Sequence, residues 1–265
     1  MNRGFFYRVT WSLRCLCAWL LLAFCPLRAA EPAPRVAAAA DLQYAFEDLL
    51  ADYARQHDER PRVTYGSSGN FFMQLSQGAP FDIFMSADEA LIGKLEAAGK
   101  TRDAGDLYAI GRVVLFVPQT VDIAVDDKLA DLGRAVVDGR LRKFAIANPE
   151  HAPYGRAARE TLEALGLSTL ITPHLVFGEN VAQAAQFVRS GAAEAGIFAL
   201  SLALAPPFKH AGRYVVIDAR YHAPLRQRMV LMRGAGPAAQ DFYRYLKSPA
   251  ARAVFERYGF TLPAS

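Results

Sequence analysis

Residues 63–86 read VTYGSSGNFFMQLSQGAPFDIFMS, and this stretch decides the fold class of the chain. A strand is predicted over 63–65, and the apolar spacing over 71–75 predicts a helix that Gly78-Ala79-Pro80 ends. The apolar run over 82–86 is typical of a short buried strand. Strand, helix and strand in this order form the repeating unit of parallel α/β proteins.

The same alternation continues along most of the chain. Further strands are expected over 35–40, 113–117, 144–147, 175–177, 196–199, 215–217 and 226–232. Helices are expected over 46–53, 90–98, 156–165 and 182–190, with a terminal pair between 238 and 258. We find no internal repeat and no long linker, so the pattern predicts an α/β protein built as one sheet or as two interleaved lobes.

Residues 1–30 differ from the rest and predict a cleaved signal peptide. Three arginines lie within the first fourteen residues, an apolar run follows over 16–27, and Ala29-Ala30 offers small residues for cleavage. About a dozen apolar residues are too few to cross a bilayer, which takes roughly 20. A lipid anchor at Cys25 is the alternative. Either route predicts export, and we expect a periplasmic protein.

The composition of the predicted mature chain excludes several function classes. Four of the 30 basic residues and none of the 26 acidic ones lie in the first 30 residues, which leaves 26 of each. A neutral chain gives no electrostatic reason to expect nucleic acid or an anionic membrane as partner. All three cysteines, Cys15, Cys17 and Cys25, also lie in that segment. The mature chain therefore has no disulfide and depends on its core for stability.

Four segments share one pattern, in which a strand ends, small or capping residues follow, and a helix begins. They are 40–42, 66–70, 153–155 and 178–181. The first backbone N–H groups of a helix lack intrahelical partners and carry the positive end of the helix dipole. Ligands of open α/β sheets bind at the carboxyl ends of the strands, where such helix starts lie. The pattern therefore predicts a site for an oxyanion held by fixed N–H donors.

Four ordered stretches resemble the periplasmic molybdate-binding proteins, over about residues 36–260. They read AAAADLQYAFEDL, YGSSGNFFMQLSQGAPFDIFMSADE, IANPEHAPYGRAARETLEALG and YLKSPAARAVFERYGF. The resemblance implies a two-lobe type II periplasmic binding protein fold, each lobe a mostly parallel sheet flanked by helices, joined by two crossover segments. We expect lobe 1 over 31–110 and 225–265, lobe 2 over 111–224, and hinges near 107–112 and 222–227.

The resemblance also implies which residues bind the ligand. Ser68 is expected to donate its hydroxyl, and the other positions act chiefly through backbone N–H groups. Some relatives have a tyrosine at the place of Ala199, and we expect the phenol of Tyr154 to replace it. Molybdenum is held as an oxyanion, with no protein atom bound to the metal. The predicted site residues are Ala40, Asp41, Ser67, Ser68, Tyr154 and Val181.

Asp41 departs from the serine or asparagine that the family has at this position. A carboxylate facing a dianion is repulsive unless its side chain turns away, and the reading we favour is that it caps its own helix. A second reading is that it accepts a proton from a protonated oxyanion such as hydrogen phosphate. Direct coordination of the metal is the third.

The predicted function is high-affinity binding of molybdate or tungstate by a monomer that delivers it to the permease and ATPase subunits of an ABC importer. No catalytic residue and no cofactor are expected. The alternatives are another oxyanion, such as phosphate or sulfate, or a small solute. A serine hydrolase that uses Ser67 or Ser68 with His151 and Asp82 is a remote alternative, because no nucleophile-elbow pattern surrounds either serine.

Overall fold

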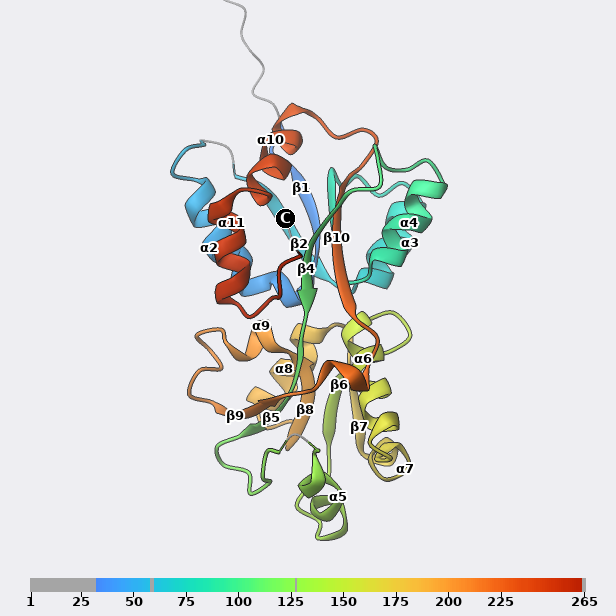
Figure 1. Ribbon diagram of the computed structural model, residues 1–265, viewed down its shortest axis with the longest axis vertical. Coiled ribbons are helices and arrows are strands. Elements are labelled where there is room, and N and C mark those ends of the chain that lie inside the picture. The colour runs from blue at the N-terminus through green and yellow to red at the C-terminus, as the bar shows by residue number, and fades with distance from the viewer. Residues whose placement is uncertain (1–31, 58–59, 127, 264–265) are drawn as a thin grey trace, which may run out of the picture. The chain divides into compact units, whose positions relative to one another are not determined.

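The first of two five-stranded sheets is formed by the two ends of the chain (Figure 1). The computed structural model describes residues 32–57, 60–126 and 128–263. In strand order β2-β1-β3-β10-β4, this sheet contains Arg62–Gly66, Arg35–Ala39, Ile83–Ser86, Leu225–Leu231 and Asp106–Gly111. β1 pairs in parallel with β2 and β3, and only β10 runs antiparallel to its neighbours.

The second sheet repeats this plan with the middle of the chain. In strand order β7-β6-β8-β5-β9, it contains Leu175–Gly178, Phe144–Ala147, Ala195–Ala199, Val113–Pro118 and Gly212–Val216. β6 pairs in parallel with β7 and β8, whereas β5 is antiparallel to β8 and β9. Each sheet is therefore mostly parallel, with one strand reversed.

Helices cover both faces of the first sheet, α2, α10 and α11 on one side and α3 and α4 on the other (Figure 1). Their bounds are α2 Gln43–Tyr53, α3 Ser68–Ser76, α4 Glu89–Ala97, α10 Pro237–Leu246 and α11 Pro249–Arg257. The helices that accompany the second sheet are α5 Ala130–Val137, α6 Pro153–Ala164, α7 Ser168–Ile171, α8 Val181–Arg189 and α9 Leu200–Ala203. Short 3-10 turns are η1 Ala40–Leu42, η2 Thr172–His174 and η3 Ala219–Tyr221.

The alternation of side chains along β1 explains why helices pack on both sides of it. Val36 and Ala38 belong to the large core cluster that includes Phe46, whereas Ala37 lies in a smaller cluster with Phe71. All three β1 residues are 0% exposed. A parallel strand that is buried on both faces needs apolar residues at all its buried positions, and after the exposed Arg35 the sequence of this strand provides them.

The chain passes between the sheets twice. It leaves the first sheet at Arg112, between β4 and β5, and returns between η3 and β10. The two passages lie side by side, because β4 and β10 pair antiparallel with Leu225 opposite Gly111 (Figure 1). The chain from Ala33 onward forms one compact unit. The predicted lobe boundaries and hinges stay predictions.

The predicted fold class is confirmed, and the differences are local. β4 and the helices α5, α7 and α9 were not expected from the sequence. α6 begins at Pro153, three residues before the expected start, because proline suits the first turn of a helix. The predicted signal peptide over 1–30 lies outside the described residues. Among the residues that are described, no helix is long and apolar enough to cross a membrane.

Candidate functional site

The starts of four helical segments meet at one small cavity, whose volume is about 190 Å³ when the open space at its mouth is included. η1 and α3 follow strands of the first sheet, and α6 and α8 follow strands of the second. All six residues predicted for the site line this cavity. Its lining is Ala39, Ala40, Asp41, Gly66, Ser67, Ser68, Ala87, Ala152, Pro153, Tyr154 and Val181. We call it the oxyanion cavity from here on.

Capping side chains satisfy some of the backbone N–H groups at these helix starts and leave others. Ser67 accepts a hydrogen bond from Asn70 N at 3.4 Å. Asn180 Oδ1 accepts from the N–H groups of the second and third residues of α8, each at 3.0 Å. The N–H groups of Ser68, Tyr154 and Val181 lie in first turns, where no intrahelical carbonyl precedes them. They are the donors that an anion in the cavity can use.

The two serines of the cavity differ in what their hydroxyls can do. Ser68 is 1% exposed, and its Oγ accepts a hydrogen bond from Ala87 N at 2.9 Å. The Ser68 hydroxyl proton is therefore free to be donated into the cavity. Ser67 Oγ lies 2.9 Å from His151 Nδ1, so its hydroxyl is already engaged across the cavity wall.

Asp41 does not cap its own helix, so the reading favoured from the sequence is wrong. Neither η1 nor α2 has a side-chain cap. The carboxylate turns instead to two donors from other elements. Its Oδ2 accepts from the Tyr154 hydroxyl at 2.9 Å and from Gln227 Nε2 at 2.6 Å. Asp41 is 1% exposed, and inside the protein these two strong donors outweigh a local cap.

Burial raises the pKa of the Asp41 carboxyl group. Desolvation raises the pKa of Asp41 to about 6, against the opposing effect of the hydrogen bonds from Gln227, from Tyr154 and from its own backbone N–H group. Within the described part of the chain, Asp41 Oδ1 has no hydrogen-bond partner. Burial also raises the pKa of Tyr154 and of Tyr108 well above 10, so both phenols remain neutral donors.

The phenol of Tyr154 does not replace the tyrosine that some relatives have at Ala199. Its hydroxyl donates to Asp41 and accepts from Gln227 Nε2 at 3.0 Å, which commits it to the protein. Ala199 is fully buried at the end of β8 and does not line the cavity. Tyr154 can therefore reach a ligand only through its backbone N–H group.

Several hydrogen bonds and one ion pair join the two sets of elements around the cavity. Gly69 N donates to His151 O at 2.9 Å, and the Ser201 hydroxyl donates to Asp41 O at 2.7 Å. Arg156 Nη2 lies 2.9 Å from Asp88 Oδ2. A Cβ on Gly69 would lie 2.5 Å from His151 O, so this close approach requires glycine.

Sequence reasoning missed Gln227 and Tyr108, which hold Asp41 in place. Tyr108 donates to Gln227 Oε1 at 2.6 Å, which fixes the orientation of the amide. Gln227 is 0% exposed, in a strand where Leu225 and Met229 share its face. A polar residue at a buried position of that alternation is a signal the sequence does contain.

The hydrolase trio considered from the sequence does not assemble. Ser67 and His151 are hydrogen-bonded to each other. Asp82 does not join them, because its carboxylate accepts from Arg35 N at 2.8 Å and from Arg35 Nε at 3.3 Å. The other ring nitrogen of His151 lies 3.7 Å from Glu179 Oε2. Searched over the described residues, the structure contains no cluster of three or more histidine, cysteine, aspartate or glutamate residues that could hold a metal ion.

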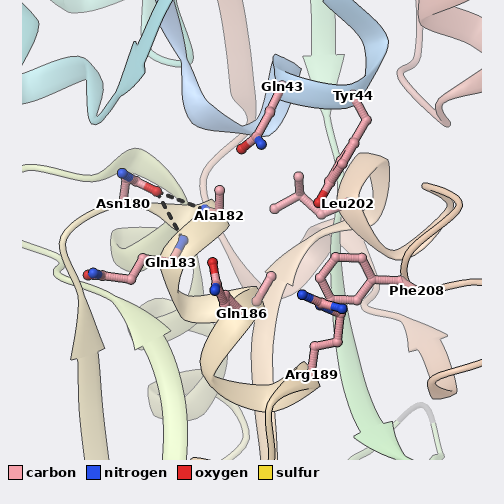
Figure 2. Close-up of a pocket in the computed structure, with 10 residues that line it drawn as sticks. Gln43, Tyr44, Asn180, Ala182, Gln183, Gln186, Arg189, Leu202 and Phe208 are labelled. Carbon is pink, nitrogen blue, oxygen red and sulfur yellow. Dashed lines mark hydrogen bonds between the residues drawn. The ribbon is translucent and has the colours of Figure 1, made fainter. Parts of the chain in front are cut away.

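A larger hollow of about 640 Å³ lies beside α8 and is less suited to a small anion (Figure 2). Gln43 and Tyr44 line it from α2, and amide side chains and Arg189 line it from α8. Figure 2 shows the Asn180 oxygen turned to its own helix. The Arg189 guanidinium lies 6.0 Å from the centre of the Phe208 ring. The starts of α2 and α8 border this hollow, whereas the smaller cavity is bordered by the starts of four helical segments from both sheets, so we take the smaller cavity as the candidate site.

Comparison with known proteins shows the family to which the chain belongs. Residues 34–261 match the family model described as bacterial extracellular solute-binding protein. The chain is 35% identical to the molybdate-binding protein ModA of Azotobacter vinelandii, with 90% of this chain and 92% of that protein covered. It is 34% identical to ModA of Rhodobacter capsulatus, with 84% and 86% covered.

A solved structure is similar over the same range. The periplasmic molybdate-binding protein of Azotobacter vinelandii superposes with a TM-score of 0.78 at 31% identity, covering 87% of this chain and all of that one. These matches confirm the resemblance inferred from the four sequence stretches. The two ModA relatives and the solved structure are all named as molybdate-binding proteins. The chain belongs to the family of bacterial extracellular solute-binding proteins.

Proposed function

We propose that the protein binds molybdate, and tungstate equally well, in the oxyanion cavity, and delivers it in the periplasm to the permease and ATPase of an ABC importer. One observation carries the proposal: four helical segments begin at a single small cavity lined by all six predicted residues. The names of the relatives, which are molybdate-binding proteins, support the choice of oxyanion.

The chemistry of the lining suits an oxyanion without any metal ligand or cofactor. No lysine or arginine lies among the described residues that line the cavity. Charge is therefore balanced by fixed N–H dipoles and by the Ser68 hydroxyl, which favour a dehydrated anion of matching size. About six charge-assisted hydrogen bonds, at about 1.5–3 kcal/mol each before desolvation and closure, suffice for the roughly 8–12 kcal/mol of micromolar to nanomolar binding.

Binding is coupled to closure of two lobes about the paired passages between the sheets. The hydrogen bonds of Gly69 and Asp41 and the ion pair of Asp88 to second-sheet elements support this proposal, because they would hold a closed form together. A ligand that contacts helix starts from both lobes shifts the population toward that form. The working protein is a monomer, and its cycle contains no catalytic step.

Isothermal titration calorimetry of the chain from Glu31 to Ser265 tests the proposal. We expect tight binding of molybdate and tungstate at neutral pH and no detectable binding of sulfate or phosphate. Sulfate has the same tetrahedral shape and charge as molybdate. A lack of sulfate binding would therefore indicate that cavity size and donor spacing set the selectivity. Tight binding of phosphate or sulfate alone would change the ligand. Absence of binding for all four anions would contradict the proposed oxyanion function.

A further inference from the structure

The Asp41 carboxyl group lies at the centre of a buried network drawn from four elements. Tyr108 on β4 donates to Gln227 Oε1 on β10, which forces the amide nitrogen of Gln227 to face Asp41. Tyr154 on α6 supplies the second donor. Both donors reach the same oxygen, Oδ2, so this oxygen acts as the acceptor whatever the protonation state of the carboxyl group.

The other oxygen is left without a protein partner. Asp41 lines the oxyanion cavity, its side chain is 1% exposed, and Oδ1 has no hydrogen bond to any described residue. Leaving a buried acceptor unpaired is unfavourable. An ionised carboxylate can only accept, whereas a protonated one offers an O–H donor. A bare carboxylate oxygen beside a bound anion is repelled, and a proton between the two converts repulsion into a hydrogen bond.

No basic side chain offsets the charge of Asp41. Its neighbours on α6, β4 and β10 are the two phenols and the amide already named, and Ser201 on α9 bonds only its backbone carbonyl. His151 Nε2 lies 3.7 Å from Glu179 Oε2, and neither residue is among the described residues that line the cavity. The elements packed against η1, which are α2, α8 and β2, carry further groups that make no hydrogen bond to Asp41 in the described structure: Tyr44, Glu47, Arg189 and Tyr65.

The basic residues on β10 are also engaged elsewhere. Arg228 Nη2 lies 2.9 Å from Glu89 Oε2, and Arg226 pairs with the same carboxylate. The raised pKa of Asp41 follows from this setting and agrees with it, because burial without a basic partner favours the protonated acid.

We propose that each oxyanion binds together with one proton, held between Asp41 Oδ1 and an oxygen of the ligand. This inference rests on the proposed function of the cavity. In the loaded form Asp41 is a neutral acid, its Oδ1–H donates to the anion, and Oδ2 still accepts from Tyr154 and Gln227. The proton comes from solvent, and no bond other than O–H changes. Asp41 thereby favours oxyanions with basic oxygens, those of weak acids, over sulfate.

Calorimetry in two buffers counts the proton directly. Molybdate is titrated at pH 7 in PIPES and in imidazole, which differ in ionisation enthalpy. We expect the two observed enthalpies to differ by the amount for about one proton taken up, and the affinity to fall by up to tenfold per unit as the pH rises from 6 to 8. Equal enthalpies and a flat pH profile with intact binding would overturn the inference and leave the proposed function standing. No binding of any oxyanion would overturn the function itself.

The variant Asp41→Asn tests whether binding depends on a hydrogen-bond donor at this position or on the negative charge of the carboxylate. Asparagine keeps the acceptor oxygen for Tyr154 and Gln227 and presents an N–H donor where the acid has its O–H. We expect it to bind molybdate without proton uptake, independently of pH, and more tightly than the native protein at pH 8. Asp82→Asn, which lies outside the cavity, is the matched control and should keep the uptake of one proton. Loss of molybdate binding in Asp41→Asn would overturn the assignment of Asp41 as a donor.

Discussion

Ser68 is the side chain whose position best fits direct contact with an anion. Its oxygen is anchored by Ala87 N, and its proton is free. In Ser68→Ala we expect molybdate binding to weaken by about 1.5–3 kcal/mol, the size of one charge-assisted hydrogen bond, or about 10- to 150-fold in affinity. Calorimetry on both proteins measures this difference.

Two measurements distinguish a lost ligand contact from a damaged fold. The substitution also leaves Ala87 N unpaired, so thermal unfolding without ligand must be recorded for the variant. Ser76→Ala is the control from the same helix, because its hydroxyl donates to Phe72 O on an exposed turn. Equal affinity in Ser68→Ala and the native protein would remove Ser68 from the site.

For single residues, the sequence predicts which positions line the cavity better than it predicts which side chains contact one another. The four helix starts that contain the six cavity residues could be located because each follows a strand, a local feature, and the family resemblance selected the residues within them. The bonds that orient Asp41 could not, because Tyr154 lies 113 residues away and Gln227 lies 186 residues away. An aspartate at a helix start favours a cap on local grounds. Only the fold shows that stronger donors compete for its carboxylate.

At the scale of elements, the start of α3 approaches the start of α6 more closely than any side chain would allow. In Gly69→Ala the new Cβ would lie 2.5 Å from His151 O, so the two helix starts must separate. We expect molybdate affinity to fall at least tenfold, because the donors of α3 and α6 would no longer reach one anion together. Titration of the variant tests this expectation.

The control for this substitution is another glycine within a helix. A Cβ on Gly93, in α4, meets no atom within 4 Å, so Gly93→Ala should keep native affinity and gain a few tenths to about 1 kcal/mol in stability. If Gly69→Ala binds as tightly as Gly93→Ala, the helix starts do not need this approach and the closed arrangement is not the binding form.

Among the elements that the sequence did not predict, β4 depends on a distant partner. The helices and parallel strands show clear periodicity, and most of their bounds were predicted within a few residues. β4 ends at Gly111 and pairs with β10, which lies more than 100 residues later in the chain. Its residues also form one passage between the sheets, so their pattern lacks the continuous apolar run that marks a central strand such as β5.

For the whole molecule, Asp41 links closure to pH. In the open form that we propose, the carboxyl group would meet water and keep its ordinary pKa of 3.8, whereas in the structure described here its pKa is about 6. The difference corresponds to ~3 kcal/mol, or roughly a hundredfold in the closure equilibrium. A raised pKa in the closed form means that closure is favoured fully below 3.8 and loses this advantage as the pH rises through about 6.

We therefore expect the unliganded protein to be more closed at pH 5 than at pH 7.5. Because all three cysteines lie in the first 25 residues, the chain from Glu31 accepts two spin labels at Met73→Cys on α3 and Val137→Cys on α5, both exposed positions. The distance distribution between them should shift toward shorter values at low pH. The shift should vanish in Asp41→Asn and persist in Asp241→Asn, which removes an exposed carboxylate on α10. A shift that survives Asp41→Asn would mean that another group controls closure, since only the loss of the buried titrating carboxyl group separates the two variants.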